Sequence, residues 1–465
     1  MSVSISRPHD HGATLVVTAL ASAFGVVLLE ATSVLTTVIE NDAVGSSGNV
    51  RLGLTAVTGV FALIAVYVGA IVTANTFATV IAGRTRQIAL LRLLGAQSRT
   101  LRRRVVREGF MIGFIGAVIG LVVGFGVTVG GVALGMAQGW LPDLAYSLVD
   151  VVLIVPVVIV ALTTGASAGV GSRRVATVSP VAATAAAVEE SATELASHRG
   201  RTVTSVILGV LGGAFLVLGV VAGFVSPLGL FIAFVGGVLS FTGVILGAHV
   251  IMPSVLRLVG RLVAPGAAGR LAAANVVRHP ERSARATIGL VIGVTLVTLF
   301  AVAMTSYNDM VTSSFEDDPE VMAVVQSSIT VSTAIFMSLV GFSAVIAAVG
   351  VVNNLSLSVL QRTRELGLLR AIGFSARQVR QTITVESAQM TIAAVGFGLV
   401  LGIIYGWAAA QSLLGALTRQ IVVPTVPWPV LMGVVVSTAA LTVIASIPPS
   451  RRATRVSPVV ALAIE

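Results

Sequence analysis

Arginine is the residue type with the most evident chemistry in this sequence, and it is concentrated in two similar segments. "RTRQIALLRLLGAQSRTLRRRVVRE" spans Arg84 to Glu108, and "RTRELGLLRAIGFSARQVRQTITVE" spans Arg362 to Glu386. Guanidinium groups bind carboxylates and phosphates through charge-assisted hydrogen bonds. Each segment could therefore dock on an acidic protein surface or on anionic lipid headgroups.

The apolar residues of these segments recur at helical spacing, with a break at a glycine. In the second segment Leu366, Leu369, Val379 and Ile383 follow this spacing around Gly373, and the first segment breaks at Gly95. Glycine permits the left-handed turn that ends one helix before the next begins. We expect a helix-turn-helix hairpin along the membrane face, which either anchors the chain by charge alone or docks on a partner.

The two segments belong to a longer repeat with a constant offset, which "RRVATVSPV" from Arg173 and "RRATRVSPV" from Arg451 extend without a gap. Orientation in a membrane needs only basic charge, so the retained spacing favours docking. The pairs in register include Arg84 with Arg362, Arg86 with Arg364, Arg92 with Arg370, Gly95 with Gly373, Arg99 with Arg377, Gly120 with Gly398, and Gly124 with Gly402.

The composition of the chain indicates whether these segments belong to a soluble or a membrane protein. The chain has 465 residues, of which 56% are hydrophobic and 10% are charged, and its mean hydropathy is +1.01. Soluble proteins carry about a quarter charged residues, so we expect an integral membrane protein and no nucleic-acid partner despite the net charge of +10. Ten apolar stretches of spanning length occur, at 13–38, 54–81, 111–137, 151–171, 203–225, 228–251, 286–306, 327–352, 388–416 and 430–448.

The distribution of arginine predicts the orientation of these spans. Of the 29 basic residues, all of them arginine, only Arg51 and Arg419 fall in the odd-numbered connections. The positive-inside rule therefore places both termini in the cytoplasm of a multi-pass cell-membrane protein. The lack of lysine and the abundance of alanine, valine and arginine suggest a GC-rich bacterial genome, such as that of an actinobacterium.

Repeat and spans together predict an all-α fold of about ten transmembrane helices. Two parallel four-span units occupy residues 1–184, with a hairpin at 84–108, and residues 266–465, with a hairpin at 362–386. Residues 185–265 form a linker and an inserted two-span hairpin. Both units start from the same side, because an even number of spans separates them.

Polar and small residues inside the spans are the remaining candidates. Glu30 is the one acid within an expected span away from its ends, which makes it a functional candidate, although an interfacial or internally paired position would also explain it. Small residues recur every four positions in the third and ninth spans and predict close packing between the two units. These residues are Gly120, Gly124, Gly398 and Gly402. No metal site is expected, since cysteine is absent and the five histidines show no zinc-binding spacing.

Several stretches resemble the FtsX-like permease domain of ABC transporters, the group that includes MacB, LolC, LolE and BceB-type permeases. They are "NNLSLSVLQRTRELGLLRAIGFSARQVRQTITVES", the closing "RRATRVSPVVAL", and "LAAANVVRHPERSARATIGLVIG", which is similar to the domain's entry segment. The resemblance covers both four-span units, roughly three quarters of the chain.

The resemblance implies the membrane subunit of a type VII ABC system, which exports or extracts an amphipathic or lipid-like substrate by mechanotransmission. The coupling elements would be residues 84–104 and 362–380, which contact a homodimer of ATPase subunits that holds ATP and magnesium. The chain itself would bind no cofactor and be no enzyme, because a P-loop needs lysine and none occurs. The residues that match best are Arg86, Arg92, Gly95, Arg364, Glu365, Arg370 and Gly373, and Gln87 stands where the second copy has Glu365.

Two differences between this sequence and the members of that group leave other functions open. The MacB and Lol proteins have a large external domain after the first span, and BceB-type permeases have one after the seventh, whereas the expected connections here are the short stretches 39–53 and 307–326. One alternative is a signalling protein of the FtsX type that relays ATPase motion to cell-wall hydrolases. Another is a proton-coupled secondary transporter that uses Glu30.

Overall fold

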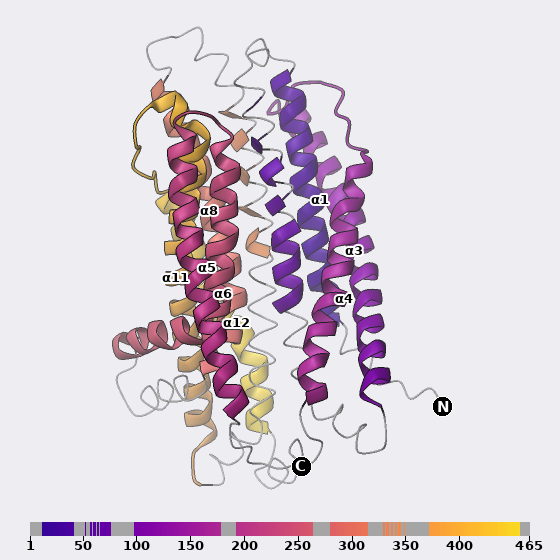
Figure 1. Cartoon of the computed structure of the whole chain (residues 1–465), viewed down its shortest axis with the longest axis vertical. Coiled ribbons are helices and arrows are strands. Elements are labelled where there is room, and N and C mark those ends of the chain that lie inside the picture. The colour runs from indigo at the N-terminus through magenta and orange to yellow at the C-terminus, as the bar shows by residue number, and fades with distance from the viewer. Residues whose placement is uncertain are drawn as a thin grey trace.

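The computed structural model describes residues 12–40, 97–177, 192–263, 280–314 and 372–455, together with short runs and single residues within 52–75 and 329–348. Regular secondary structure in this part of the chain is helical throughout. Most of the helices run along the long axis of the molecule (Figure 1). The elements are α1 (Gly12–Glu40), α3 (Ser98–Ala137), the 3-10 helix η3 (Val151–Leu153), α4 (Ile154–Thr177), α5 (Ala192–Gly223), α6 (Gly229–Val263), α8 (Pro280–Ser314), α11 (Ala376–Thr418) and α12 (Trp428–Arg455).

The helices are of membrane-spanning length and composition, which confirms the expected fold class. Within the described ranges, seven are long and apolar enough to cross a bilayer. Two shorter apolar helices, Gly59–Asn75 and Trp428–Ile444, correspond to the second and tenth expected spans. The expected span at 327–352 falls mostly on residues outside those that the structure describes.

Helix boundaries reproduce the sequence repeat. α3 begins at Ser98 and α11 at Ala376, and α4 ends at Thr177 while α12 ends at Arg455. Both pairs have the same separation as Arg84 and Arg362 in the sequence motifs. The start of α1 and the end of α12 lie at the same end of the bundle (Figure 1).

The helices form two groups. α1, α3 and α4 pack on one another, and α11 packs on both α8 and α12, so each unit is built around its third span. The inserted hairpin of α5 and α6 packs on α11 and α8 of the second unit (Figure 1). The hairpin thus extends the second half of the bundle.

Aromatic side chains fill the centre between the two groups. The ring of Phe24 on α1 lies 6.3 Å from that of Phe300 on α8, measured between centroids. Phe61 lies 6.2 Å from Phe300 and 5.6 Å from Phe336, both in edge-on geometry. Such pairs contribute about 0.5–1.5 kcal/mol beyond their buried area, so this cluster holds the two units together.

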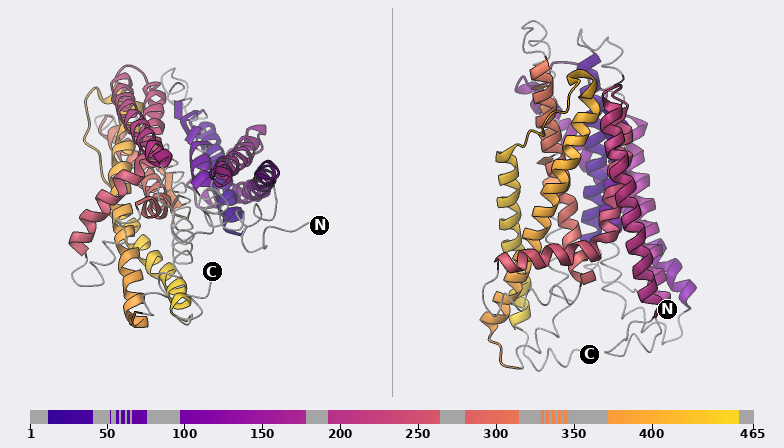
Figure 2. Two further views of the ribbon diagram at one scale, coloured as in Figure 1. Left: turned by 60° about the horizontal axis from the view of Figure 1, so that its bottom comes forward. Right: turned by 60° about the vertical axis from the view of Figure 1, so that its left-hand side comes forward.

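The sixth span differs from the expected one at its end. α6 continues to Val263 and contains Pro253, just beyond the expected end of the span. Proline removes a backbone hydrogen bond and bends a helix, and the remainder of α6 turns to lie across the lower part of the bundle (Figure 2). Met252 and Leu256 in this part are almost completely buried against α8 and α11.

The connection between α11 and α12 is held by several hydrogen bonds. Trp407 donates its indole N–H to the carbonyl of Val422 at 2.7 Å. The Gln411 side chain donates to the carbonyl of Gln420 and accepts from the backbone N–H of Val422, both at 3.0 Å. The Thr425 hydroxyl donates to Asp309 at 2.9 Å, which ties this connection to the end of α8 as well.

Candidate functional site

The beginnings of α3 and α11 are the described parts of the two arginine-rich segments. Ser98 and Ala376, their first residues, occupy equivalent positions in the repeat. Leu101 and its counterpart Val379 are buried, whereas Arg99 and Arg377 are exposed. Each helix therefore anchors its first turn on the protein by an apolar side chain and presents a guanidinium group to the surroundings.

The start of α11 is fixed by a complete capping motif. Gly373 has a φ of +104°, a conformation that a residue with a Cβ rarely adopts. The Ser375 hydroxyl accepts from the backbone N–H of Gln378 at 3.2 Å, and the Gln378 side chain accepts from the backbone N–H of Ser375 at 2.8 Å. This reciprocal pair satisfies two backbone donors and fixes the start of the helix that was expected after Gly373, while the helix expected before it lies outside the described residues.

The first copy lacks this cap. Gln97 stands at the N-cap of α3 and makes no side-chain capping bond. The capping pair Ser375 and Gln378 went unnoticed in the sequence, although serine followed by glutamine three residues later is the signal for it. The two helix starts are consequently equivalent in position but differ in local stability.

The second helix of each expected hairpin, after Gly95 or Gly373, is not a separate short helix along the membrane face. α3 runs 40 residues and α11 runs 43 residues without interruption, so each second arm is continuous with the following span. Repeated apolar residues on either side of the expected boundary allow this continuity. The other predicted coupling residues lie outside the described part of the chain, and they are Arg84, Arg86, Arg92, Gly95, Arg362, Arg364, Glu365 and Arg370.

The four predicted packing glycines lie at close helix contacts, but within each unit rather than between the units. A Cβ on Gly124 of α3 would lie 2.9 Å from the Ala23 carbonyl oxygen on α1, and Gly120 also faces α1. A Cβ on Gly398 of α11 would lie 3.0 Å from Cβ of Val294 on α8, and Gly402 also faces α8. The expectation of a seam between units was wrong, because a small-residue stripe does not reveal which helix it meets.

Glu30 lies inside the bundle on α1. Its side chain is 2% exposed, and neither carboxyl oxygen has a hydrogen-bond partner among the described residues. Thr128 of α3 faces Glu30, but its hydroxyl donates to the carbonyl of Gly124 at 3.2 Å. Glu30 is therefore a buried acid enclosed by protein side chains, and its functional role stays a prediction.

A polar clasp, formed by Tyr67, Ser240, Thr242 and Tyr405, joins the two units through α6 and was not found in the sequence. The hydroxyl of Tyr67, in the second span of the first unit, lies 2.9 Å from the hydroxyl of Thr242 and donates to the Val238 carbonyl at 3.2 Å. The hydroxyl of Tyr405 on α11 lies 2.9 Å from that of Ser240. Tyrosines within apolar spans are the signal that could have revealed it, since buried hydroxyls need partners.

Other kinds of site find no support in the part of the chain that the structure describes. No three metal-binding side chains come together there. His249, which could be suspected as a ligand, lies 3.1 Å through Nε2 from the Thr202 hydroxyl and 2.9 Å through Nδ1 from the Leu246 carbonyl. This histidine therefore links α6 to α5.

Comparison with known proteins gives the same division of the chain. The model of the FtsX-like permease C-terminal family matches residues 59–180 and again residues 337–458, which together exceed half of the chain. The two matches are in the same register as the helix starts and ends, so family model and structure define one repeat.

Individual relatives align with about a third of the chain. The chain is 31% identical to the uncharacterized ABC transporter permease YknZ of Bacillus subtilis over 146 residues, which are 31% of this chain and 35% of YknZ. It is 26% identical over 135 residues to an uncharacterized ABC transporter permease of Methanocaldococcus jannaschii, covering 29% of this chain and 34% of the relative. It is 28% identical over 151 residues to the macrolide export ATP-binding/permease protein MacB of Sodalis glossinidius, covering 32% of this chain and 22% of MacB.

These matches span about a third or less of the curated relatives' own lengths. The double family match covers the second, third and fourth spans of both units, and its two copies have the same separation as the starts of α3 and α11. The chain therefore belongs to the FtsX-like permease family and contains two copies of its C-terminal domain.

Proposed function

We propose that the chain is the membrane subunit of an ABC transporter that moves an amphipathic or lipid-like substrate outward by mechanotransmission. The observation that carries this proposal is the duplicated family domain, in which α3 and α11 begin at equivalent residues with exposed arginines. Because a single chain carries two copies of one docking element, it could bind two identical partner subunits, one at each copy. A homodimer of ATPase subunits is therefore the proposed partner.

Docking would use the segments 84–108 and 362–386. The described portion of each segment begins a helix that buries an apolar residue, Leu101 or Val379, and whose arginines are exposed except for the half-buried Arg102. An arginine fork binds carboxylates in a bidentate manner, so an acidic groove on the ATPase fits this surface. Because α3 and α11 continue into the bundle, displacement of their first turns would move whole spans.

ATP and magnesium are assigned to the partner in this proposal. The chain contains no lysine, and the lysine of a P-loop reaches the β- and γ-phosphates. The printed name of MacB joins an ATP-binding part to a permease part, and the match to this chain covers 22% of that protein. A separate ATPase would supply the ATP-binding part here, and this chain would hold no cofactor of its own.

The location we propose is the bacterial cell membrane, with both termini in the cytoplasm. The starts of α3 and α11, which carry exposed arginines, lie at the same end of the bundle as the start of α1 and the end of α12 (Figure 1). The positive-inside rule assigns that end to the cytoplasm.

Charge reversal at the docking segments tests the proposal. The chain would be co-expressed with the ATPase encoded beside it, purified, and assayed for ATP hydrolysis in nanodiscs. Arg99→Glu with Arg377→Glu reverses two exposed charges at the described helix starts, and Arg92→Glu with Arg370→Glu reverses two more within the segments. Arg199→Glu is the matched control, because Arg199 is also exposed but lies on α5.

We expect each double variant to lower recovery of the ATPase about tenfold or more, equivalent to about 1.4 kcal/mol, while the control retains it. Normal complex formation and ATP hydrolysis in both double variants would overturn the docking assignment. A flux that needs no ATPase, follows a pH gradient and is abolished by Glu30→Gln would instead indicate a secondary transporter.

A further inference from the structure

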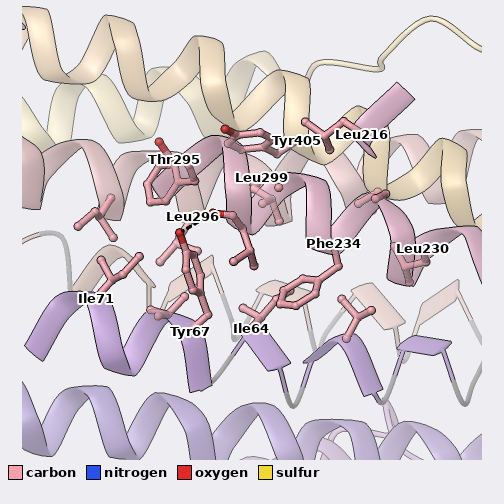
Figure 3. Close-up of a pocket in the computed structure, with 18 residues that line it drawn as sticks. Ile64, Tyr67, Ile71, Leu216, Leu230, Phe234, Thr295, Leu296, Leu299 and Tyr405 are labelled. Carbon is pink, nitrogen blue, oxygen red and sulfur yellow. Dashed lines mark hydrogen bonds between the residues drawn. The ribbon is translucent and has the colours of Figure 1, made fainter. Parts of the chain in front are cut away.

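An apolar cavity of about 110 Å³ lies where the first unit meets the inserted hairpin and the second unit. Its walls come from the second span, α5, α6, α8 and α11, and Figure 3 shows the lining side chains. Every wall belongs to an element of the membrane-spanning part. The medium that surrounds the cavity is therefore hydrocarbon rather than water.

The lining offers almost no hydrogen-bonding capacity to a ligand. The hydroxyls of Tyr67 and Tyr405, the two tyrosines in its wall, are both bonded to α6 in the clasp described above. The lining contains no charged residue among those that the structure describes, and Thr295, whose buried hydroxyl has no partner among the described residues, is its remaining residue with a polar side chain. One hydroxyl cannot replace the hydration that a charged or strongly polar ligand would lose there, so an apolar occupant fits best.

The cavity is open at the surface of the described bundle. Ile64, Phe234 and Leu299 in its lining are only partly buried. An engineered apolar cavity of about 150 Å³ in another protein stays dry and holds a molecule as large as benzene. The cavity described here is slightly smaller and accommodates the last few carbons of an acyl chain. If it stayed empty, the atoms that line it would lack dispersion contacts on that side.

We propose that this cavity holds the end of an acyl chain of a bilayer lipid. The lipid chain is apolar, narrow and present in the surrounding medium, and the cavity supplies no group that would select a headgroup. The bound chain end fills the space between the second span of the first unit and α6 and α8. It acts as a lipid spacer next to the clasp, and this role does not depend on what the protein transports.

Gly237 allows a variant that fills the cavity. This residue lines the cavity on α6, and a Cβ added to it would meet no other atom within 4 Å. Gly237→Leu therefore places a side chain in the cavity without a clash at its Cβ. Gly213→Leu is the matched control, because Gly213 also has open space around it but lies on α5 outside the cavity.

The experiment uses the full chain in nanodiscs that contain phosphatidylcholine with a diazirine near the end of one acyl chain. After photolysis, the adducts are mapped by mass spectrometry. We expect adducts on lining residues such as Ile64, Phe234 and Leu296, reduced about fivefold or more in Gly237→Leu and unchanged in Gly213→Leu. Phosphatidylglycerol with the same chain should give the same pattern.

Two results would overturn the proposal. One is labelling confined to side chains on the outer surface of α5, such as Val210 and Val217, which are exposed. The other is labelling of the lining by one headgroup class alone, which would indicate recognition of a particular lipid. If Gly237→Leu does not fold, Ala409→Leu fills the cavity from α11, and the wild-type adduct map remains decisive.

Discussion

The carbonyl oxygens of Ala23 on α1 and Thr295 on α8 occupy equivalent positions in the two units, because each lies 2.9 Å from a Cβ built on the matching glycine, Gly124 or Gly402. In this register Glu30 on α1 corresponds to Val302 on α8, and both side chains are buried. One unit thus carries an acid where the other carries an apolar residue. The difference breaks the pseudo-symmetry inside the membrane.

Replacement of Glu30 by glutamine should leave the bundle folded. The amide has the shape of the carboxyl group and no charge, so we expect the unfolding free energy in nanodiscs to stay within about 1 kcal/mol of wild type. Glu30→Lys puts a cation at the same buried site and should cost about 2.5–3.5 kcal/mol. Thermal unfolding of both variants measures the effect, and a glutamine variant that fails to fold would refute this view of the site.

The glycine contact between α1 and α3 predicts a contrast between two alanine substitutions. Gly124→Ala inserts a methyl group 2.9 Å from the Ala23 carbonyl oxygen, which should destabilise the first unit by about 1–3 kcal/mol. Gly126→Ala on the same helix meets no atom within 4 Å and should be neutral or stabilising by up to about 1 kcal/mol. Equal unfolding temperatures for the two variants would contradict the assignment of this contact.

Removal of hydroxyl groups from the clasp should loosen the two units. Tyr67→Phe and Tyr405→Phe each delete hydrogen bonds to α6, and such bonds inside membranes contribute about 0.6 kcal/mol on average. The chain has no cysteine, so spin labels on introduced cysteines can report the distance between the units. We expect a broader distance distribution in the double variant, and an unchanged one in Tyr146→Phe, whose hydroxyl donates to Pro142 within its own loop.

The unequal helix caps predict unequal protection of the two helix starts. Ser375→Ala removes the side chain that caps α11 and should cost about 0.5–2 kcal/mol locally. Hydrogen exchange of the amides of residues 376–380 should accelerate, while exchange at the start of α3 stays the same. Conversely, Gln97→Ser supplies a capping side chain to α3 and should slow exchange in its first turn. Absence of both changes would show that neighbouring packing, rather than the cap, fixes these helix starts.

Much of the fold followed from the sequence because apolar length and internal register are local properties. The repeat anticipated that α3 and α11 would begin, and α4 and α12 would end, at equivalent residues. The helix start after Gly373 was also foreseeable, since glycine permits the positive φ found there. Docking of the arginine-rich segments on an ATPase stays a prediction.

Contacts between spans that are distant in the sequence were harder to predict. The partner helix of Gly120 and Gly398 depends on how the spans within each unit pack, which hydropathy does not encode, because lipid and protein neighbours are both apolar. The clasp draws Tyr67, Thr242 and Tyr405 from three segments, each of which carries an isolated polar residue without a local motif. The continuation of α6 beyond Pro253 also escaped notice, since its residues read simply as the end of a span.

The unbroken length of α11 makes it a lever arm. Its 43 residues extend about 65 Å, so a rotation of about 5° about one end displaces the other by about 6 Å. The hydrogen bonds of Trp407 and Gln411 fasten the far end to the connection that Thr425 ties to α8. A tilt of α11 about its first turn would therefore displace the connection to α12 at the opposite end, and the end of α8 would have to move with that connection.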